Sequence, residues 1–80
     1  MIRMEVSLVQ LRAGEKGEIK RIEGGPMFHN KMASLNIRPG KVIIKVAAQP
    51  FRGPITIDVN GRRITLGRGM AMRIFVEVGG

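Results

Sequence analysis

The sequence predicts a small all-β protein, a five-stranded antiparallel barrel with one α-helix inserted between the first and second strands. Eleven Gly and four Pro separate short apolar stretches, the spacing expected of several short strands. Within those stretches apolar residues alternate with period two. With 80 residues, the chain is expected to form one domain over residues 1–80. An open sheet of five strands would leave an apolar face uncovered, so we expect the sheet to close.

The first strand is expected at residues 17–22. Its apolar residues Ile19 and Ile22 break strict alternation, so a regular strand would turn them to opposite faces. A β-bulge adds one residue and brings both side chains back to the same face. The sequence therefore predicts a bulge in this strand.

A helix is expected at residues 27–35. Its apolar residues recur at i, i+4 and i+7, which places them on one helical face: Phe28, Met32 and Leu35. Pro26 suits a first helical turn, where its missing N–H costs nothing. Asn36 tolerates a left-handed conformation and Pro39 prevents continuation, so we expect the helix to end there. This helix is expected to close one opening of the barrel.

The second strand is expected at residues 42–48. One alternating set is assigned to its buried face: Val42, Ile44, Val46 and Ala48. Ile43 then faces the other way, and Phe75 is out of phase with the last strand in the same manner. Either the helix covers these two side chains or a partner does, so both are candidates for contact with a partner.

The third and fourth strands are expected to form a hairpin. Apolar residues alternate on both sides of its turn, Ile55, Ile57 and Val59 before it and Ile64 and Leu66 after it. Asn60-Gly61 accepts positive φ at both central positions of a type I′ turn. Residues 50–54, with two prolines, are expected to turn between the second and third strands. A short helix at 69–73 and a fifth strand at 74–78 complete the prediction.

Composition limits the compartment and the partners. The chain has no Cys, and no basic-then-apolar signal segment opens it, which together indicate a reducing cytoplasm. No stretch is long and apolar enough to span a bilayer. The net charge of +8 and the pI near 11.5 favour an acidic partner: nucleic acid, anionic lipid or an acidic protein face.

The order of these features resembles the ferrous iron transport protein A (FeoA) family, from about Val6 to Glu77. The family's opening Leu-x-x-Leu-x-x-Gly-x-x-Gly-x-Ile pattern is matched by Leu8, Leu11, Gly14, Gly17 and Ile19. Three later patterns match at Leu35, Ile37, Pro39 and Gly40, at Gly53 and Pro54, and at Ala71, Ile74 and Val76. The ordered set carries the resemblance, because no single piece is diagnostic.

Two positions depart from the pattern of that family. Asn36 stands where Gly is usual, a mild change because Asn is the next-best residue for a left-handed conformation. Lys31 stands where Arg is common, and a lysine cannot copy a bidentate contact.

The resemblance implies an SH3-like barrel in the cytoplasm that assists a membrane ferrous iron transporter with a cytoplasmic GTP-binding domain. It also implies a fold similar to the C-terminal domain of metal-dependent transcriptional repressors. We therefore expect a non-enzymatic accessory or regulatory protein that acts as a protein-protein interaction module. The alternatives are a basic small-barrel nucleic-acid-binding module and a metal-responsive regulatory domain.

Catalytic and metal chemistry have few candidate residues. A catalytic site needs convergent titratable groups, and the chain has one His, no Cys and no Tyr. We expect no enzymatic activity and no firmly bound cofactor. His29 and Glu23 are weak candidates for transition-metal (Fe2+ or Zn2+) binding, in a weak or intermolecular site.

The remaining expectation is a binding surface. The candidate partner-binding residues are Phe51 and Arg52 in the predicted turn, together with Lys31 and Arg38, because aromatics and Arg are favoured in interface cores. Three methionines are expected to fill gaps in the barrel: Met32, Met70 and Met72. Non-specific polyanion binding is expected at low salt. An exposed strand edge or a shared His29 metal site can pair two copies into a homo-oligomer.

Overall fold

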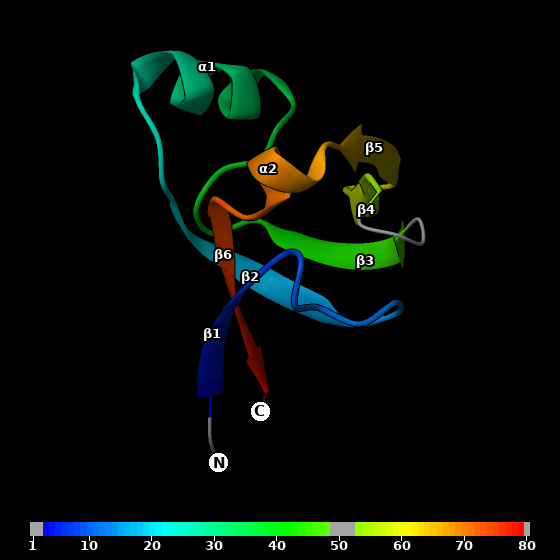
Figure 1. The fold of residues 1–80 in the computed structure, drawn as a ribbon. Helices are drawn as coiled ribbons and strands as arrows, with labels where there is room; N and C mark the ends of the chain where they lie inside the picture. The colour runs from blue at the N-terminus through cyan, green and yellow to red at the C-terminus, as the bar shows by residue number, and fades with distance from the viewer. Residues whose placement is uncertain (1–2, 49–52, 80) are drawn as a thin grey trace.

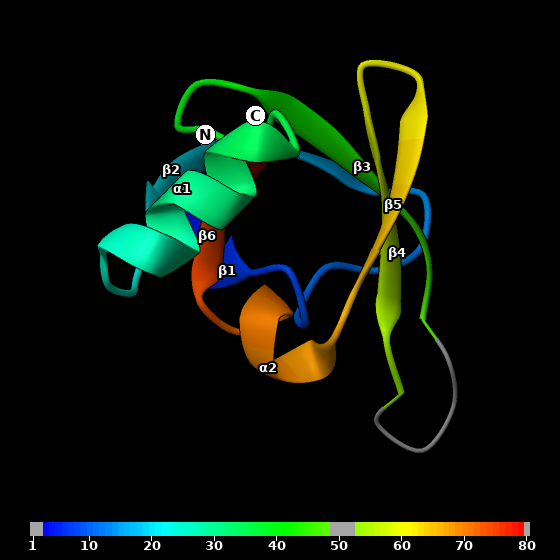
Figure 2. The same cartoon turned by 90° about the horizontal axis from the view of Figure 1, so that it is seen from above.

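The structure, a computed structural model, describes residues 3–48 and 53–79. Its elements in chain order are β1 (Arg3–Ser7), β2 (Lys16–Ile22), α1 (Pro26–Ser34), β3 (Val42–Ala48), β4 (Ile55–Val59), β5 (Arg62–Leu66), α2 (Arg68–Ala71) and β6 (Ile74–Gly79). All strand pairs are antiparallel, in the order β1-β6-β2-β3-β4-β5. The sheet bends round into a small barrel (Figures 1 and 2). The mainly β fold and the helix between the first two predicted strands are confirmed.

The structure has one strand more than predicted, because β1 precedes the five expected strands. It pairs with β6 in register, with Val6 opposite Val76. An edge strand buries little, and here Met4 is 58% exposed while Val6 is only half-buried. Its sequence therefore lacks the clear alternation of a half-buried strand. The pairing places the start of the chain beside its end (Figure 1).

The bulge predicted in the first expected strand, now β2, is confirmed. The register of β2 against β6 shifts between Ile19 and Arg21. The extra residue lets both Ile19 and Ile22 point into the core, where they are 0% and 9% exposed.

Helix α1 lies across one end of the barrel (Figures 1 and 2), as predicted. Met32 is its fully buried side chain, and Phe28 and Leu35 pack partly buried against the core. The helix ends at Ser34, and Asn36, which follows the C-cap Leu35, has a left-handed φ of +65°. The N–H groups of Asn36 and Ile37 donate to the carbonyls of Ala33 and Met32, both at 2.9 Å. This is a Schellman motif, and it folds Ile37 back onto the core.

The predicted facing of β3 is wrong. Ile43 is fully buried, whereas Val42 and Ile44 are 51% and 41% exposed. Ile43 pairs with Val59 and Lys45 with Ile57, so the inner row of β3 follows the buried row of β4. Lys45 is only 4% exposed. Because the charged Lys45 belongs to the core-facing set, the outward-facing set is the more apolar one in the sequence. The outward-facing set was therefore assigned to the core. Ile43 is therefore not a contact candidate.

The predicted hairpin of β4 and β5 is confirmed. Asn60 and Gly61 have φ values of +54° and +83°, as a type I′ turn requires. Ile55, Ile57 and Val59 are almost completely buried. Residues 49–52 of the preceding predicted turn lie outside the described residues.

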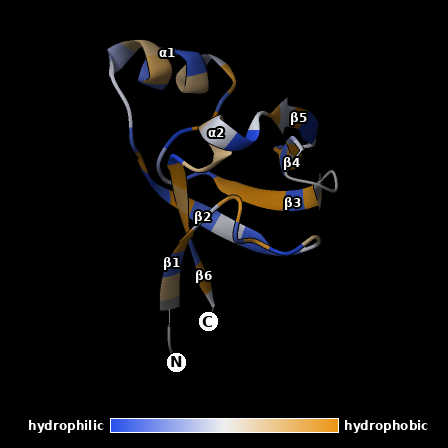
Figure 3. Cartoon of the chain, viewed as in Figure 1, coloured by the Kyte–Doolittle hydropathy of each residue, from blue (hydrophilic) through white to orange (hydrophobic). Residues whose placement is uncertain are grey.

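The apolar side chains meet in one core. It is built from every strand except β1, from both helices, from the loop between β1 and β2 and from the loop between α1 and β3. Its residues are Leu8, Leu11, Ile19, Ile22, Met32, Ile37, Ile43, Ile55, Ile57, Val59, Leu66, Ala71, Ile74 and Val76. Figure 3 shows hydrophobic residues along β3 and β6. Met32 and Met70 pack in or against this core as predicted, but Met72 is 56% exposed and does not. Within the described chain, neither helix has the length and hydropathy to cross a bilayer.

Candidate interaction surface

A buried lysine supports the loop between β1 and β2. The Lys45 ammonium donates to the carbonyl oxygens of Val9 and Leu11, at 3.1 and 2.5 Å. The backbone of Lys45 also holds the loop, since Gly14 N–H donates to its carbonyl at 2.7 Å and its own N–H donates to the Glu15 carbonyl at 2.9 Å. Lys45 therefore fixes both ends of this loop to β3.

The electrostatic surroundings of Lys45 are unfavourable for its charge. Burial lowers the pKa of Lys45 below 10.5, and the positive charge of Arg68 lowers it further, with Glu15 acting weakly in the opposite direction. Lys45 has no acidic hydrogen-bond partner among the residues described. Two cations therefore lie near each other with little neutralisation.

A surface groove of about 500 Å³ lies beside this loop. It is lined by Ser7, Val9, Gln10, Arg68, Met72 and Phe75, and we call it the Arg68 groove. Its lining combines an apolar part (Val9, Met72, Phe75) with polar groups and one cation. Within residues 3–48 and 53–79, the Arg68 side chain has no hydrogen-bond or ion-pair partner. The groove is therefore an open site with an unneutralised guanidinium.

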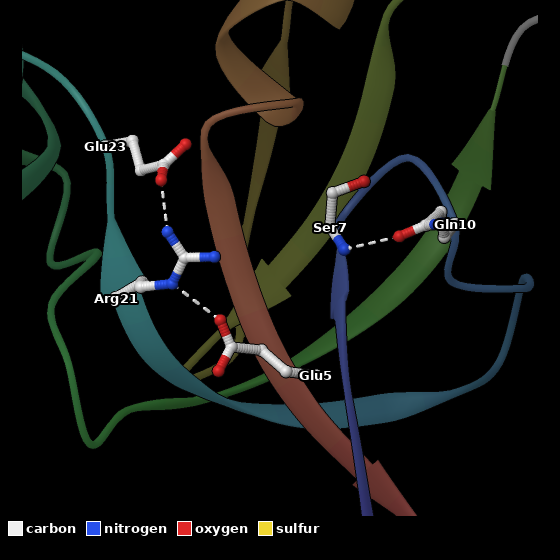
Figure 4. A network of polar contacts seen from close by, with 5 residues as sticks. All are labelled: Glu5, Ser7, Gln10, Arg21 and Glu23. Atoms are coloured by element: carbon white, nitrogen blue, oxygen red, sulfur yellow. Dashed lines mark hydrogen bonds and ion pairs between the residues drawn. The ribbon is translucent and has the colours of Figure 1, made fainter.

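Phe75 is held by the ion-pair network drawn in Figure 4. The Arg21 guanidinium lies 4.0 Å from the centre of the Phe75 ring and donates to Glu5 Oε1 at 2.7 Å. It also pairs with Glu23. Phe75 is half-buried, so the prediction that it faces away from the core holds only in part, because Arg21 covers one face of its ring.

The positive charge is unevenly distributed along the chain. Residues 38–73 contain eight Lys and Arg but one acidic residue, Asp58. Asp58 is engaged by the Gly61 N–H, at 2.9 Å from its Oδ1. Four of the other carboxylates lie in ion pairs on the β1, β2 and β6 side: Glu5 and Glu23 with Arg21, and Glu18 and Glu77 with Lys20. The surplus charge therefore belongs to β3, β4, β5, α2 and the loops between them.

The two candidate metal ligands are not brought together into a metal site. His29 is exposed on α1, and Glu23 is exposed and paired with Arg21. No three His, Asp or Glu side chains of the described residues gather in a group that could hold a metal ion. These residues do not present the ligand set of a closed zinc or iron site.

The structure places two of the four candidate partner-binding residues. Lys31 is exposed on α1, and Arg38 is exposed in the loop after it, where its Nη2 lies 3.5 Å from the Ala33 carbonyl oxygen. Both therefore belong to the α1 end of the barrel. Phe51 and Arg52 lie outside the described residues.

Sequence reasoning missed both Lys45 and the Arg68 groove. One signal for Lys45 was present: a single charged residue in phase with Ile43, opposite a β4 strand whose inner face is purely apolar. The groove gave no such signal, because its lining comes from β1, the following loop, α2 and β6, which are far apart in sequence.

Two relatives share most of the chain. It is 33% identical over 66 residues to a protein provisionally named Fe(2+) transport protein A from Methanocaldococcus jannaschii, covering 82% of this chain and 78% of that protein. It is 30% identical over 71 residues to a Porphyromonas gingivalis protein named as a fusion of Fe(2+) transport protein A and the Fe(2+) transporter FeoB. That match covers 89% of this chain and 8% of the fusion protein.

Two solved structures share the fold. A crystal structure of an iron uptake regulatory protein (FeoA) matches with a TM-score of 0.86 and 36% identity, covering 94% of this chain and all of that one. A manganese-dependent transcriptional repressor matches with a TM-score of 0.84 and 25% identity, covering 95% of this chain and 42% of the repressor.

These likenesses define the class as the small SH3-like barrels that occur as a whole chain and as part of metal-dependent repressors. The FeoA domain model matches residues 6–78. This chain belongs to the FeoA domain family.

Proposed function

We propose that this protein is a non-enzymatic accessory protein of ferrous iron transport. It acts in the cytoplasm by binding the cytoplasmic part of a membrane ferrous iron transporter that has a GTP-binding domain. The protein regulates or assists the transporter through its outer surface, because its interior is filled by the apolar core.

The observation that carries this proposal is the fused relative. In the Porphyromonas gingivalis protein, a domain similar to this chain shares one polypeptide with the transporter FeoB. Covalent linkage raises the effective concentration of two modules that bind each other. A separate chain of the same family can bind the transporter as a second molecule. Without a covalent linker, the affinity of its interaction surface alone must hold the two proteins together.

The surface supports binding rather than catalysis. The charged residues of positions 38–73 are predominantly cationic, and a charge of one sign steers a partner of opposite sign during encounter. A reaction would need a nucleophile, a base and an orienting group in hydrogen-bond reach. The described residues offer one His, exposed on α1, and carboxylates scattered among β1, β2, β4 and β6.

A direct binding measurement with the purified cytoplasmic part of the transporter tests this function. Wild type is compared with the double variant Phe51→Ala plus Arg52→Glu, and with Lys31→Glu and Arg38→Glu. Lys16→Glu is the matched control, because Lys16 is an exposed lysine outside the candidate set. We expect wild type and the control to bind and the double variant to lose most of the affinity.

The outcomes separate the partner from the contact site. Equal binding by the double variant and wild type removes Phe51 and Arg52 from the site. Absence of binding by wild type, with both proteins folded, contradicts the partner itself.

A second candidate function is binding to nucleic acid, which the charge of residues 38–73 favours. Charge alone gives only non-specific binding, and the affinity of such binding for a single-stranded oligonucleotide falls steeply with salt, because counterion release drives it. If the affinity for the oligonucleotide stayed unchanged when salt was raised several-fold, contacts beyond charge would be holding it. Nucleic-acid binding would then be favoured over transporter binding.

A further inference from the structure

We propose that the Arg68 groove binds a short acidic peptide segment, with a carboxylate on the Arg68 guanidinium and a neighbouring apolar side chain against Val9, Met72 and Phe75. The inference rests on the proposed function only for the source of the segment, which we assign to the cytoplasmic part of the transporter. The groove thus defines a second contact surface, whose lining residues differ from the four candidates Lys31, Arg38, Phe51 and Arg52.

The apolar part of the groove places an exposed methionine next to a half-buried aromatic ring. Met72 is 56% exposed, although it directly follows the fully buried Ala71. The Arg21 guanidinium lies 4.0 Å from the centre of the Phe75 ring and limits the motion of that ring. A flexible Met side chain next to a fixed ring forms an adaptable apolar site. It suits an aliphatic or aromatic side chain of a partner.

The polar part of the groove consists of donors. The Gln10 side-chain oxygen already accepts the Ser7 N–H at 2.9 Å (Figure 4), so the half of its amide left to bind a ligand is the NH2 group. The Ser7 hydroxyl can also donate, and Arg68 adds a planar guanidinium that fits a carboxylate in bidentate geometry. Because these groups are hydrogen-bond donors, they favour a ligand with hydrogen-bond acceptors. The charge of Arg68 further favours a ligand that is an anion.

The neighbourhood of the groove strengthens this selection. Val9 lines the groove, and its carbonyl oxygen accepts a hydrogen bond from the Lys45 ammonium at 3.1 Å. A buried cation therefore lies directly behind this part of the groove wall. Burial lowers the pKa of Lys45, and repulsion by the nearby Arg68 lowers it further. A carboxylate on Arg68 offsets this repulsion, so binding of the segment raises the pKa of Lys45.

Size and composition favour a peptide over other anions. A volume of about 500 Å³ lies in the range of sites that bind a few side chains. A polyphosphate backbone would leave the apolar part uncovered. A second depression, of about 280 Å³ beside Val42, is lined by Glu18 and Glu77 as well as Lys16, so it has no excess of cations.

Nuclear magnetic resonance titration with synthetic peptides tests the proposal. The peptide is acetyl-Glu-Leu-Glu-Leu-amide, and it is compared with versions carrying Gln for Glu or Gly for Leu. We expect shifts at the Met72 methyl group, the Gln10 amide and the Arg68 side chain, and affinity lower by about tenfold or more for either altered peptide. The pKa of Lys45 should rise on binding of the parent peptide.

Paired variants separate the groove from general charge. Arg68→Gln should weaken binding by about tenfold or more, whereas Arg63→Gln, which removes an exposed arginine from β5 opposite Asp58, should change it less than twofold. Met72→Gln should weaken binding with no change of net charge. Equal losses from Arg68→Gln and Arg63→Gln, or stronger groove binding by an oligothymidine than by the peptide, would overturn the proposal.

Competition links the groove to the transporter. Excess peptide should displace the transporter's cytoplasmic part from wild type. If the transporter binds and the peptide does not compete, the groove is not its contact surface, although the proposed function stands. If the peptide binds in the groove and the transporter does not bind at all, the proposed function fails while the peptide site stands.

Discussion

The Lys45 ammonium lies 2.5 Å from the carbonyl oxygen of Leu11, across 34 positions of the chain. This contact joins the inner face of β3 to the loop that continues into the Arg68 groove. One side chain thereby couples the stability of the barrel to the shape of the groove wall. A buried lysine that satisfies two backbone carbonyls is costly to replace, because both carbonyls then lose their donor.

Replacing Lys45 by Met should destabilise the fold. Met keeps the apolar stem but leaves the carbonyls of Val9 and Leu11 without their donor, and we expect the free energy of unfolding to fall by about 1–3 kcal/mol. Denaturant unfolding followed by circular dichroism measures the change. Lys31→Met is the matched control, because Lys31 is exposed, and it should change stability much less. Equal stability of Lys45→Met and wild type would show that the two hydrogen bonds contribute little.

The stability gap between wild type and Lys45→Met should depend on pH. The folded pKa of Lys45 lies below its unfolded value of 10.5, because of burial and Arg68. Below 10.5 the unfolded state therefore binds more protons, so wild type gains stability as the pH rises through the folded pKa toward 10.5. Lys20, whose pKa is raised by Glu18 and Glu77, acts in the opposite direction above 10.5, and it does so in both proteins.

Unfolding curves of both proteins between neutral pH and pH 10 check this dependence. The stability of wild type relative to Lys45→Met should increase with pH across that range. A constant difference would mean that the Lys45 pKa is the same in the folded and unfolded states.

Asn36→Ala should weaken the end of α1. Asn36 has a φ of +65°, a conformation that costs Ala more than Asn, and we expect a loss of about 1 kcal/mol in the free energy of unfolding. Asn36→Gly should be neutral or stabilising, because Gly adopts positive φ without strain. Thermal unfolding compares these with Asn30→Ala, at an exposed position inside α1. A loss with Gly as large as the loss with Ala would assign the effect to the Asn side chain instead.

Much of this fold could be predicted from local sequence rules. The Asn60-Gly61 turn, the end of α1 at Asn36 and the bulge in β2 each follow from the conformational preferences of a few adjacent residues. The facing of β3 could not be predicted in the same way. Its alternation is apolar on both faces except at Lys45, and the buried role of Lys45 depends on carbonyls of a loop distant in sequence.

The candidate site was less predictable than the fold. The exposed positions of Lys31 and Arg38 follow from the polar face of α1 and from the turn after it. The Arg68 groove joins Ser7, Gln10 and Phe75 with the α2 segment, and no local pattern indicates that tertiary arrangement. The expectation that Phe75 faces away from the core held only in part, since Phe75 is half-buried, and its cover by Arg21 requires the pairing of β2 with β6.

Metal binding by the single chain should be weak. Calorimetry with ferrous or zinc ion should give no stoichiometric sub-micromolar binding, because His29 and the carboxylates of the described residues form no cluster of three. His29→Ala should leave the titration unchanged. Tight stoichiometric binding that His29→Ala abolishes would contradict this and assign His29 to a metal site.

The central claim is that the outer surface of this barrel binds the cytoplasmic part of a ferrous iron transporter. A nuclear magnetic resonance footprint tests it most directly, with labelled protein and an unlabelled transporter fragment. We predict amide shifts confined to residues 51 and 52 and to surface residues of the Arg68 groove and the α1 end, with buried residues such as Ile57 unaffected. An unchanged spectrum in the presence of excess folded fragment would contradict the account.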